Sequence, residues 1–415
     1  MRNQYKHNVD TDISITYIVT SKRLTLVASL GVTIGIAIFI FMNCMTAGFT
    51  RKSNAMIFSN TPHIRVYEDD QVSKPLLKSN DTNMLNLVSN PKIVPRSNRI
   101  IDPERIVALL KSQPEVTVVT PQITLNIFYN SGMSMITGNA SGVGIMEADR
   151  MFAIRSTMVE GKMEDLEVFP NGILLGVGIA SKMNVKTGDN ISITSSRNVT
   201  KVMKVAGLFR TKNTLTDKTK SYISIHSAQQ LMLEGASYVT DINVDVTDFR
   251  KAEDYSARFS ALTGYKAEDW KAANETLVSA ANMRSVLVSA ISLSILLVAG
   301  FGIYNILNMT ISQKINDIAI LKAMGFQGSD VIRIFVLQGA LIGLMGILAG
   351  LLLAILLVFL TSRIYLGGDI GYFPIVFDIA IFIKGSLFGL FITLLAGYLP
   401  ARKAANVDPV SIFRK

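Results

Sequence analysis

The stretch "INDIAILKAMGFQGSDVIRIFVLQG", residues 315–339, changes character halfway along. In its first half, apolar and polar residues alternate at near-helical spacing, which predicts a short amphipathic helix over 313–326. Gly325 can end this helix, and Ser329 or Asp330 can cap the next one. The chain then turns apolar for long enough to enter a membrane. This stretch therefore predicts a surface helix directly before a membrane span.

The composition lies between those of soluble and of purely membrane-embedded proteins. Of the 415 residues, 49% are hydrophobic and only 17% are charged, and the mean hydropathy is positive. A hydrocarbon core of about 30 Å needs roughly 20 helical residues, and four apolar stretches reach that length. The interval 49–283 separates the first stretch from the second and must hold a folded domain. We predict membrane spans at 24–48, 284–309, 331–361 and 377–399.

The Lys and Arg residues lie mainly at the ends of the apolar stretches. Because cytoplasmic flanks retain such residues, 1–23, 310–330 and 400–415 should be cytoplasmic, whereas 49–283 and a loop at 362–376 should lie outside. We expect a multi-pass protein of the inner (cytoplasmic) membrane with both termini cytoplasmic. The first span is too long for a signal peptide, which favours a retained anchor. Topology also accounts for the net charge of +10, so no nucleic acid partner is expected.

The outer segment shows the pattern of an α/β domain. Helices are expected after Asp102, an N-cap followed by Pro103, and over about 251–262. A strand and a helix at each end enclose a β-rich segment. We predict a membrane α-helical fold with four transmembrane helices and a large extracytoplasmic α/β domain, containing an inserted β-rich subdomain at about 131–225. Its strands are predicted at 62–68, 115–129, 198–209 and 241–246.

Two stretches of the outer domain need separate interpretation. Residues 71–99 are rich in Asn, Ser, Lys and Pro and predict a loop. The stretch 172–193 has Gly176 and Gly178 but lacks the third glycine of a nucleotide fingerprint. It therefore predicts a strand, a short helix and a turn at Gly188.

A long helix is predicted to join the outer domain to the second span. No glycine or proline interrupts Trp270 to Ala299, so one helix could run from Trp270 to Met309 and measure about 60 Å. The alternative is a break near Ala280. The first span can likewise continue through 50–58, giving two stalks that could act as levers.

The sequence contains no motif for catalysis or for binding a cofactor or metal. It has neither a phosphate-binding loop, nor a zinc motif, nor a nucleophile elbow, and its three histidines are scattered. We therefore expect a non-catalytic chain. Lys384, the one charge well inside a span, is expected to snorkel outward rather than bind an ion. Small-residue motifs at 339–343, 346–350 and 385–389 predict close packing within one helix bundle.

The helix at 313–326 could lie on lipid or fit another protein. Lipid-binding interfacial helices usually carry more basic and aromatic residues, which favours a knob that enters a protein groove.

Several segments resemble one family. "DIAILKAMGFQGSDVIRIFVLQGALIGLMGILAG" and the C-terminal "LPARKAANVDPVSIFRK" resemble the signatures of ABC-transporter permeases of the FtsX-like, macrolide-exporter (MacB-like) type. Within that group, "MNCMTAGF", "TPHIRV", "LLGVGIASKMNVKTGDNISI" and "EDWKAANETLVSAANMRS" are most similar to the lipoprotein-releasing (LolC/LolE-like) permeases. The resemblance covers nearly the whole chain.

The resemblance implies a dimer of permease chains, alike or different, with two copies of a cytoplasmic ABC ATPase. ATP would be bound by that ATPase, and closure of the ATPases would move the outer domains, a process called mechanotransmission. The coupling helix would contact the ATPase. Its candidate residues are Asp317, Ile318, Ile320, Leu321, Ala323, Met324 and Gly325.

The resemblance further implies that a lipidated protein leaves the outer leaflet of membrane lipid between the first two spans and passes to a soluble periplasmic carrier. The family's carrier-binding permease has a long hook where this chain has only "TSSRNVT", which puts direct carrier capture by this chain in question. Residues at the access path would be Met42, Met45, Phe49, Val286, Val288 and Leu293.

We expect a permease subunit that extracts lipoproteins from the membrane. One alternative is efflux of a peptide or small amphiphile, as in macrolide exporters. The other is FtsX-like signalling to a cell-wall hydrolase, without transport.

Overall fold

In the computed structural model the chain forms two compact units, a helical unit of Met1–Lys52 and Ser279–Lys415, and a strand-rich unit of Ser53–Val278. The structure describes residues 2–72, 93–94, 98–131, 134–211, 213–367, 371–407 and 412.

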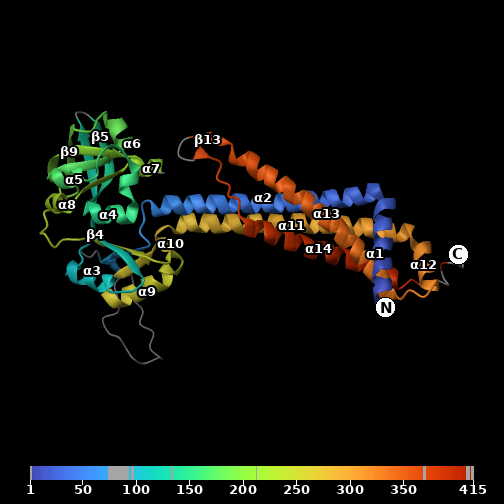
Figure 1. Cartoon of the computed structure of the whole chain (residues 1–415). Coiled ribbons are helices and arrows are strands. Elements are labelled where there is room, and N and C mark those ends of the chain that lie inside the picture. Colours follow the sequence, from blue (N-terminus) through green and yellow to red (C-terminus); the bar gives the residue numbers. More distant parts are fainter. Residues whose placement is uncertain are drawn as a thin grey trace, which may run out of the picture. The chain divides into compact units, whose positions relative to one another are not determined.

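Among the described residues, four helices of the helical unit are long and apolar enough to cross a membrane. Three of them contain a predicted span in full, whereas the fourth begins at Ile379, shortly after the predicted start at 377. They lie alongside one another, and a shorter helix, α1, lies across one end of the bundle (Figure 1). The predicted membrane fold with four transmembrane helices is confirmed. The elements of this unit are α1 (Arg2–Thr20), α2 (Lys22–Phe58), α11 (Glu275–Gln313), α12 (Ile315–Ala323), α13 (Gly328–Ser362), α14 (Ile379–Ala405), β13 (Tyr365–Gly367) and β14 (Gly371–Tyr372).

The predicted small-residue motifs lie where these helices touch. A Cβ at Gly346 of α13 would lie 2.6 Å from the Cβ of Val32 in α2, and one at Gly389 of α14 would lie 2.3 Å from the Cδ1 of Ile36. At Gly339 it would approach the α14 backbone to 3.3 Å. Glycine lets the backbones come this close, which confirms packing within one bundle.

The structure corrects the predicted helix from Trp270. A short helix, α10 (Trp270–Ala273), ends at Asn274, whose φ of −125° is not helical, and α11 begins at Glu275. The Asn274 side chain donates a hydrogen bond to the carbonyl oxygen of Trp270 at 2.9 Å. This side-chain bond stabilises a turn that sequence periodicity could not indicate. The alternative break near Ala280 is also wrong, since α11 runs unbroken for 39 residues, about 58 Å.

The first span does continue into 50–58, as predicted, because α2 runs unbroken to Phe58. Both α2 and α11 begin in one unit and end in the other.

Among the described residues, the strand-rich unit is built on one ten-stranded sheet. Neighbouring strands follow the order β12-β1-β11-β4-β5-β10-β7-β9-β6, with β8 against β4 and β9. Its strands are β1 (Ile64–Tyr67), β4 (Val116–Ser131), β5 (Ser134–Val143), β6 (Met158–Gly161), β7 (Gly172–Gly176), β8 (Asn190–Ser195), β9 (Thr200–Phe209), β10 (Lys220–Ser224), β11 (Asp241–Val246) and β12 (Lys266–Asp269). Its helices are α3 (Pro103–Lys111), α4 (Ile145–Phe152), α5 (Asp165–Val168), α6 (Val177–Met183), α7 (Thr214–Asp217), α8 (Ile225–Met232), α9 (Ala252–Thr263) and α10, with 3-10 turns at Ile154–Thr157 and Phe249–Lys251.

The predicted strands and helices of this unit are present. Asp102 caps α3, accepting a hydrogen bond from the backbone N–H of Arg105 with Pro103 at the first helical turn. The stretch 172–193 forms β7, α6, a turn with Gly188 at φ +97° and β8, as predicted. Of the predicted loop at 71–99, Gln71–Val72 pairs with Ile93–Val94 as β2 and β3, and most of the remainder lies outside the described residues.

Strand β4 joins the insertion to the rest of the unit. Its first half pairs with β11, and from Gln122 onward it pairs with β5. Separate buried clusters lie on the two sides, one around Ile123, Ile173 and Ile193, the other around Ile64 and Phe259. The insertion therefore has its own core but extends the same sheet.

Candidate docking site at α1 and α12

Helix α12 exposes one side and buries the other. Ile318 and Ala319 are buried, whereas Ile320 is 47% and Met324 is 66% exposed. The helix ends at the predicted place, because Gly325 has a φ of +99°, a left-handed conformation that glycine adopts without strain. This geometry leaves an apolar side of α12 available to a partner.

The start of α13 differs from the prediction. Gln327 is its N-cap, and Asp330, at the third helical position, accepts a hydrogen bond from the backbone N–H of Gln327 at 2.8 Å. Ser329 therefore lies inside the helix, and Asp330 takes part in a capping box instead of being the cap residue. The correction moves the helix start back to Gly328.

Helix α1 is the part of the site that sequence reasoning missed. The hydroxyl of Ser14 donates to the carbonyl oxygen of Ile334 in α13 at 2.9 Å. The rings of Tyr17 and Phe335 stack with centroids 6.0 Å apart. Val9, Ile13 and Tyr17 recur every four residues, a spacing that could have predicted this amphipathic helix.

An apolar groove of about 400 Å³ lies between α1 and α12. Ile13 and Tyr17 line it from α1, and Ile320 and Leu321 line it from α12. Burial, with a smaller contribution from the negative charge of Asp317, raises the pKa of Tyr17. The phenol therefore stays neutral at the wall of the groove.

One ion pair lies at the start of α12, and hydrogen bonds from Lys322 join the helix to the C-terminal segment. Lys314 lies 3.1 Å from Asp317 in an ion pair. Lys322, on the opposite side from Met324, donates to the carbonyl oxygens of Ala405 and Val407 at 2.9 and 2.6 Å. The helix is thus bound to the C-terminal end of α14.

The structure separates the predicted coupling residues into two groups. Ile318 packs into a buried cluster with residues of α1, α13 and α14, so we assign it to packing and remove it from the candidate contact surface. The remaining six lie on or beside the groove and the exposed side: Asp317, Ile320, Leu321, Ala323, Met324 and Gly325.

The predicted access residues gather around a contact between α2 and α11. The side-chain amide of Asn43 lies 3.5 Å from the hydroxyl oxygen of Ser292. Met42, Met45 and Phe49 of α2 are partly buried. On α11, Val286 is 67% and Leu293 is 49% exposed, whereas Val288 is buried and cannot contact a cargo directly.

Arg284 is a second residue that the sequence did not single out. Its guanidinium lies 5.1 Å from the centroid of the Phe49 ring. Its Nε and Nη2 atoms are buried, and the described residues offer them no hydrogen-bond acceptor. A cation with unsatisfied donors therefore lies beside one of the predicted access residues.

Comparison with known families identifies the chain as a membrane permease of the ABC-transporter type. Residues 25–262 match the MacB-like periplasmic core domain, and residues 289–409 match the FtsX-like permease C-terminal domain. The first match covers more than half of the chain, so the chain belongs to this family, and the resemblance inferred from its sequence is confirmed.

The relatives of the chain include lipoprotein-releasing permeases and macrolide exporters. The chain is 23% identical to the lipoprotein-releasing system transmembrane protein LolC of Neisseria meningitidis serogroup B, over 97% of this chain and 98% of that protein. It is 24% identical to LolC of Xylella fastidiosa, over 80% and 86% of the two chains. It is also 34% identical to the macrolide export ATP-binding/permease protein MacB of Bradyrhizobium diazoefficiens, over 32% of this chain and 20% of that protein.

Proposed function

We propose that this permease receives force from a cytoplasmic ABC ATPase at the groove between α1 and α12. The observation that supports this most directly is the exposure of Ile320 and Met324 beside an apolar groove. Apolar side chains of one helix that enter a groove on a partner are a common mode of protein recognition. Two ATPase copies would serve a dimer of permease chains, and ATP would be bound by the ATPase.

We place the permease in the inner membrane of the cell. In the proposed orientation, the end of the helical unit that carries α1 and α12 lies in the cytoplasm. Lys314, Lys322 and Arg402 flank the spans at α12 and at the end of α14. Cytoplasmic loops retain such residues, which makes both termini cytoplasmic and the strand-rich unit extracytoplasmic.

The proposed transmission path runs along α2 and α11. Each is one uninterrupted helix, longer than the roughly 20 residues that a bilayer requires. A continuous helix keeps its backbone hydrogen bonds when it tilts, so displacement at its cytoplasmic end would reach the strand-rich unit.

The proposed cargo is a lipoprotein extracted from the outer leaflet. The similarity to lipoprotein-releasing permeases extends over nearly the whole chain. Val286 and Leu293 present apolar surface suited to acyl chains. Strands β8 and β9 are joined by the short segment 196–199, so we assign any docking of a soluble carrier to the second permease chain.

Co-purification with the ATPase tests the docking site. Met324→Arg and Leu321→Asp each place a charge against an apolar surface and should abolish ATPase retention, while membrane insertion stays intact. The matched controls, Met324→Leu and Leu321→Met, keep apolar character and similar volume and should retain the ATPase. Full retention by both charged variants would remove this assignment.

A further inference from the structure

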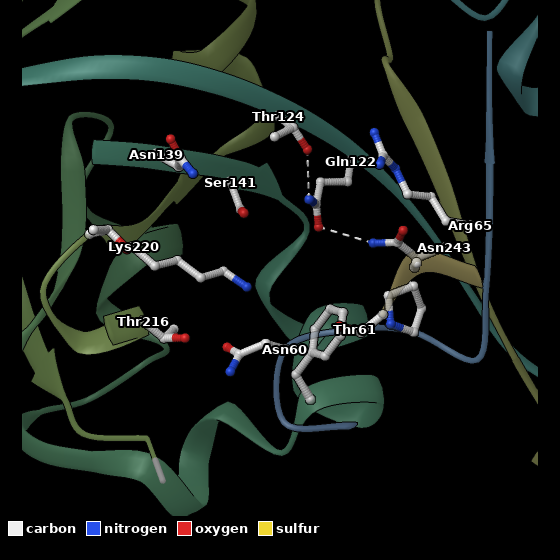
Figure 2. Close-up of a pocket in the computed structure, with 14 residues that line it drawn as sticks. Asn60, Thr61, Arg65, Gln122, Thr124, Asn139, Ser141, Thr216, Lys220 and Asn243 are labelled. Atoms are coloured by element: carbon white, nitrogen blue, oxygen red, sulfur yellow. Dashed lines mark hydrogen bonds between the residues drawn. The ribbon is translucent and has the colours of Figure 1, made fainter. Parts of the chain in front are cut away.

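A second cavity lies entirely within the strand-rich unit and plays no part in the docking or access paths. Its volume is about 370 Å³. It is lined by the segment before β1, by β1, β4, β5 and β11, by the ends of α4 and α10, and by the segment from α7 to β10 (Figure 2). It lies where the insertion meets the rest of the sheet. Its lining is rich in amides and hydroxyls and includes two cations, Arg65 and Lys220.

Of these two cations, Arg65 is already neutralised. Its Nε lies 2.6 Å from an oxygen of Asp241, which is 1% exposed. Thr124 and Thr240 donate hydrogen bonds to the other carboxylate oxygen of Asp241 at 2.8 and 2.6 Å. Arg65 therefore adds no free positive charge to the cavity.

Lys220 keeps its charge available. Its side chain points into the cavity (Figure 2), and its ammonium lies 5.3 Å from the ring centroid of Phe152 and 4.8 Å from that of Tyr222. No carboxylate among the described residues lies within ion-pair distance of it. The rings orient this cation without neutralising it, so the cavity holds one uncompensated positive charge.

Uncharged groups around Lys220 also have free hydrogen-bonding capacity. The hydroxyls of Ser141 and Thr216 line the cavity without making a hydrogen bond to the described residues. The side-chain oxygen of Asn60 is buried and accepts no hydrogen bond there, while its nitrogen donates to Ser59 at 3.1 Å. A ligand that satisfies this set must supply acceptors for the donors and one donor for Asn60.

We propose that the cavity binds the carboxylate end of a peptide or of an N-acylated amino acid. One lysine and two hydroxyls match the single negative charge and the acceptor oxygens of a carboxylate. The amide N–H adjacent to that carboxylate supplies the donor that the oxygen of Asn60 lacks, and Phe152 offers an apolar wall to the side chain. This assignment does not depend on the ATPase-docking proposal.

Saturation-transfer NMR on the full chain in lipid nanodiscs tests the proposal, with two probes that differ in one group. N-acetyl-Ala-Ala carries a free carboxylate, whereas N-acetyl-Ala-Ala-amide does not. The acid should receive saturation, and the amide should bind about tenfold more weakly, the loss expected for one charge-assisted hydrogen bond. Equal transfer to both probes, or transfer to neither, would overturn the proposal.

A lysine pair provides the matched control. Lys220→Met should reduce binding of the acid to the level of the amide, and Lys218→Met, at an exposed lysine outside the cavity lining, should leave it unchanged. The comparison of acid with amide uses the unaltered chain, so it remains decisive if Lys220→Met fails to fold. Undiminished binding by a folded Lys220→Met chain would also overturn the assignment.

Discussion

The hydroxyl of Ser14 in α1 donates a hydrogen bond to the carbonyl oxygen of Ile334 in α13, across 2.9 Å of a buried contact. The same hydroxyl also lies 2.7 Å from the carbonyl oxygen of Asp10. Because Ser14 is fully buried, α1 is a packed part of the helical unit. One wall of the groove therefore depends on this contact.

Replacing Ser14 tests whether α1 forms that wall. Ser14→Leu adds volume at a packed site and should detach α1, so amides of residues 9–20 should exchange faster and ATPase retention should fall. Ser14→Ala, the control, should cost only about 1 kcal/mol and keep the ATPase bound. Hydrogen–deuterium exchange measures the first effect. Slow exchange in the Leu variant would show that the contact does not hold α1.

Two residues of α12 should respond differently to truncation. Ile318→Ala leaves a cavity in a buried cluster and should lower the free energy of unfolding by about 3 kcal/mol. Met324→Ala, at an exposed position, should change it by less than about 0.5 kcal/mol yet weaken ATPase binding. Thermal unfolding and co-purification separate the two effects. A large stability loss in the Met324 variant would place that side chain in the core.

Helix packing predicts a contrast between two glycines. At Gly346 an added Cβ would meet Val32 at 2.6 Å, whereas at Gly302 nothing lies within 4 Å. Gly346→Ala should therefore lower the melting temperature of the detergent-solubilised protein, and Gly302→Ala should not. Equal melting temperatures would mean that α2 and α13 separate more readily than their packing indicates.

One substitution can remove both bonds from Lys322 to the C-terminal segment. Lys322→Met keeps most of the side-chain volume but loses the donors to Ala405 and Val407. Amide exchange in residues 401–407 should accelerate, because the end of α14 loses its link to α12. Lys314→Met, which removes an ion pair on the same helix, should leave that region protected.

Crosslinking tests the access path. Met42→Asn together with Met45→Asn should weaken photo-crosslinking of a lipidated substrate, because polar groups there disfavour acyl chains. Leu352→Asn, at an exposed apolar position on α13, should leave the crosslink intact. Unchanged crosslinking in the double variant would show that the substrate enters at another place.

Local signals predicted the elements well. The lengths of the apolar stretches predicted the membrane spans. Asp102 and Pro103 predicted the start of α3, and Gly325 predicted the end of α12. Each of these features depends on a few neighbouring residues or on the mean hydropathy of a long stretch. Each can therefore be predicted from a single sequence.

Features that depend on distant residues were not predictable in this way. The burial of Ile318 requires α13 and α14. The break before α11 was missed for a different reason, because it depends on one local side-chain bond from Asn274 to Trp270 that helical periodicity does not indicate. The Nε and Nη2 atoms of Arg284 find no acceptor among the described residues, which depends on what surrounds them in three dimensions. The cavity around Lys220 likewise requires strands that are far apart in sequence.

Strand β4 has a consequence for how the strand-rich unit can deform. Its ladder to β11 lies along one edge and its ladder to β5 along the other, and both ladders include Gln122. The two halves of the unit are therefore joined through the backbone of one continuous strand, whose interstrand hydrogen bonds restrict its bending more than a loop would. We expect the unit to move largely as one body, with any twist between its halves concentrated near Gln122.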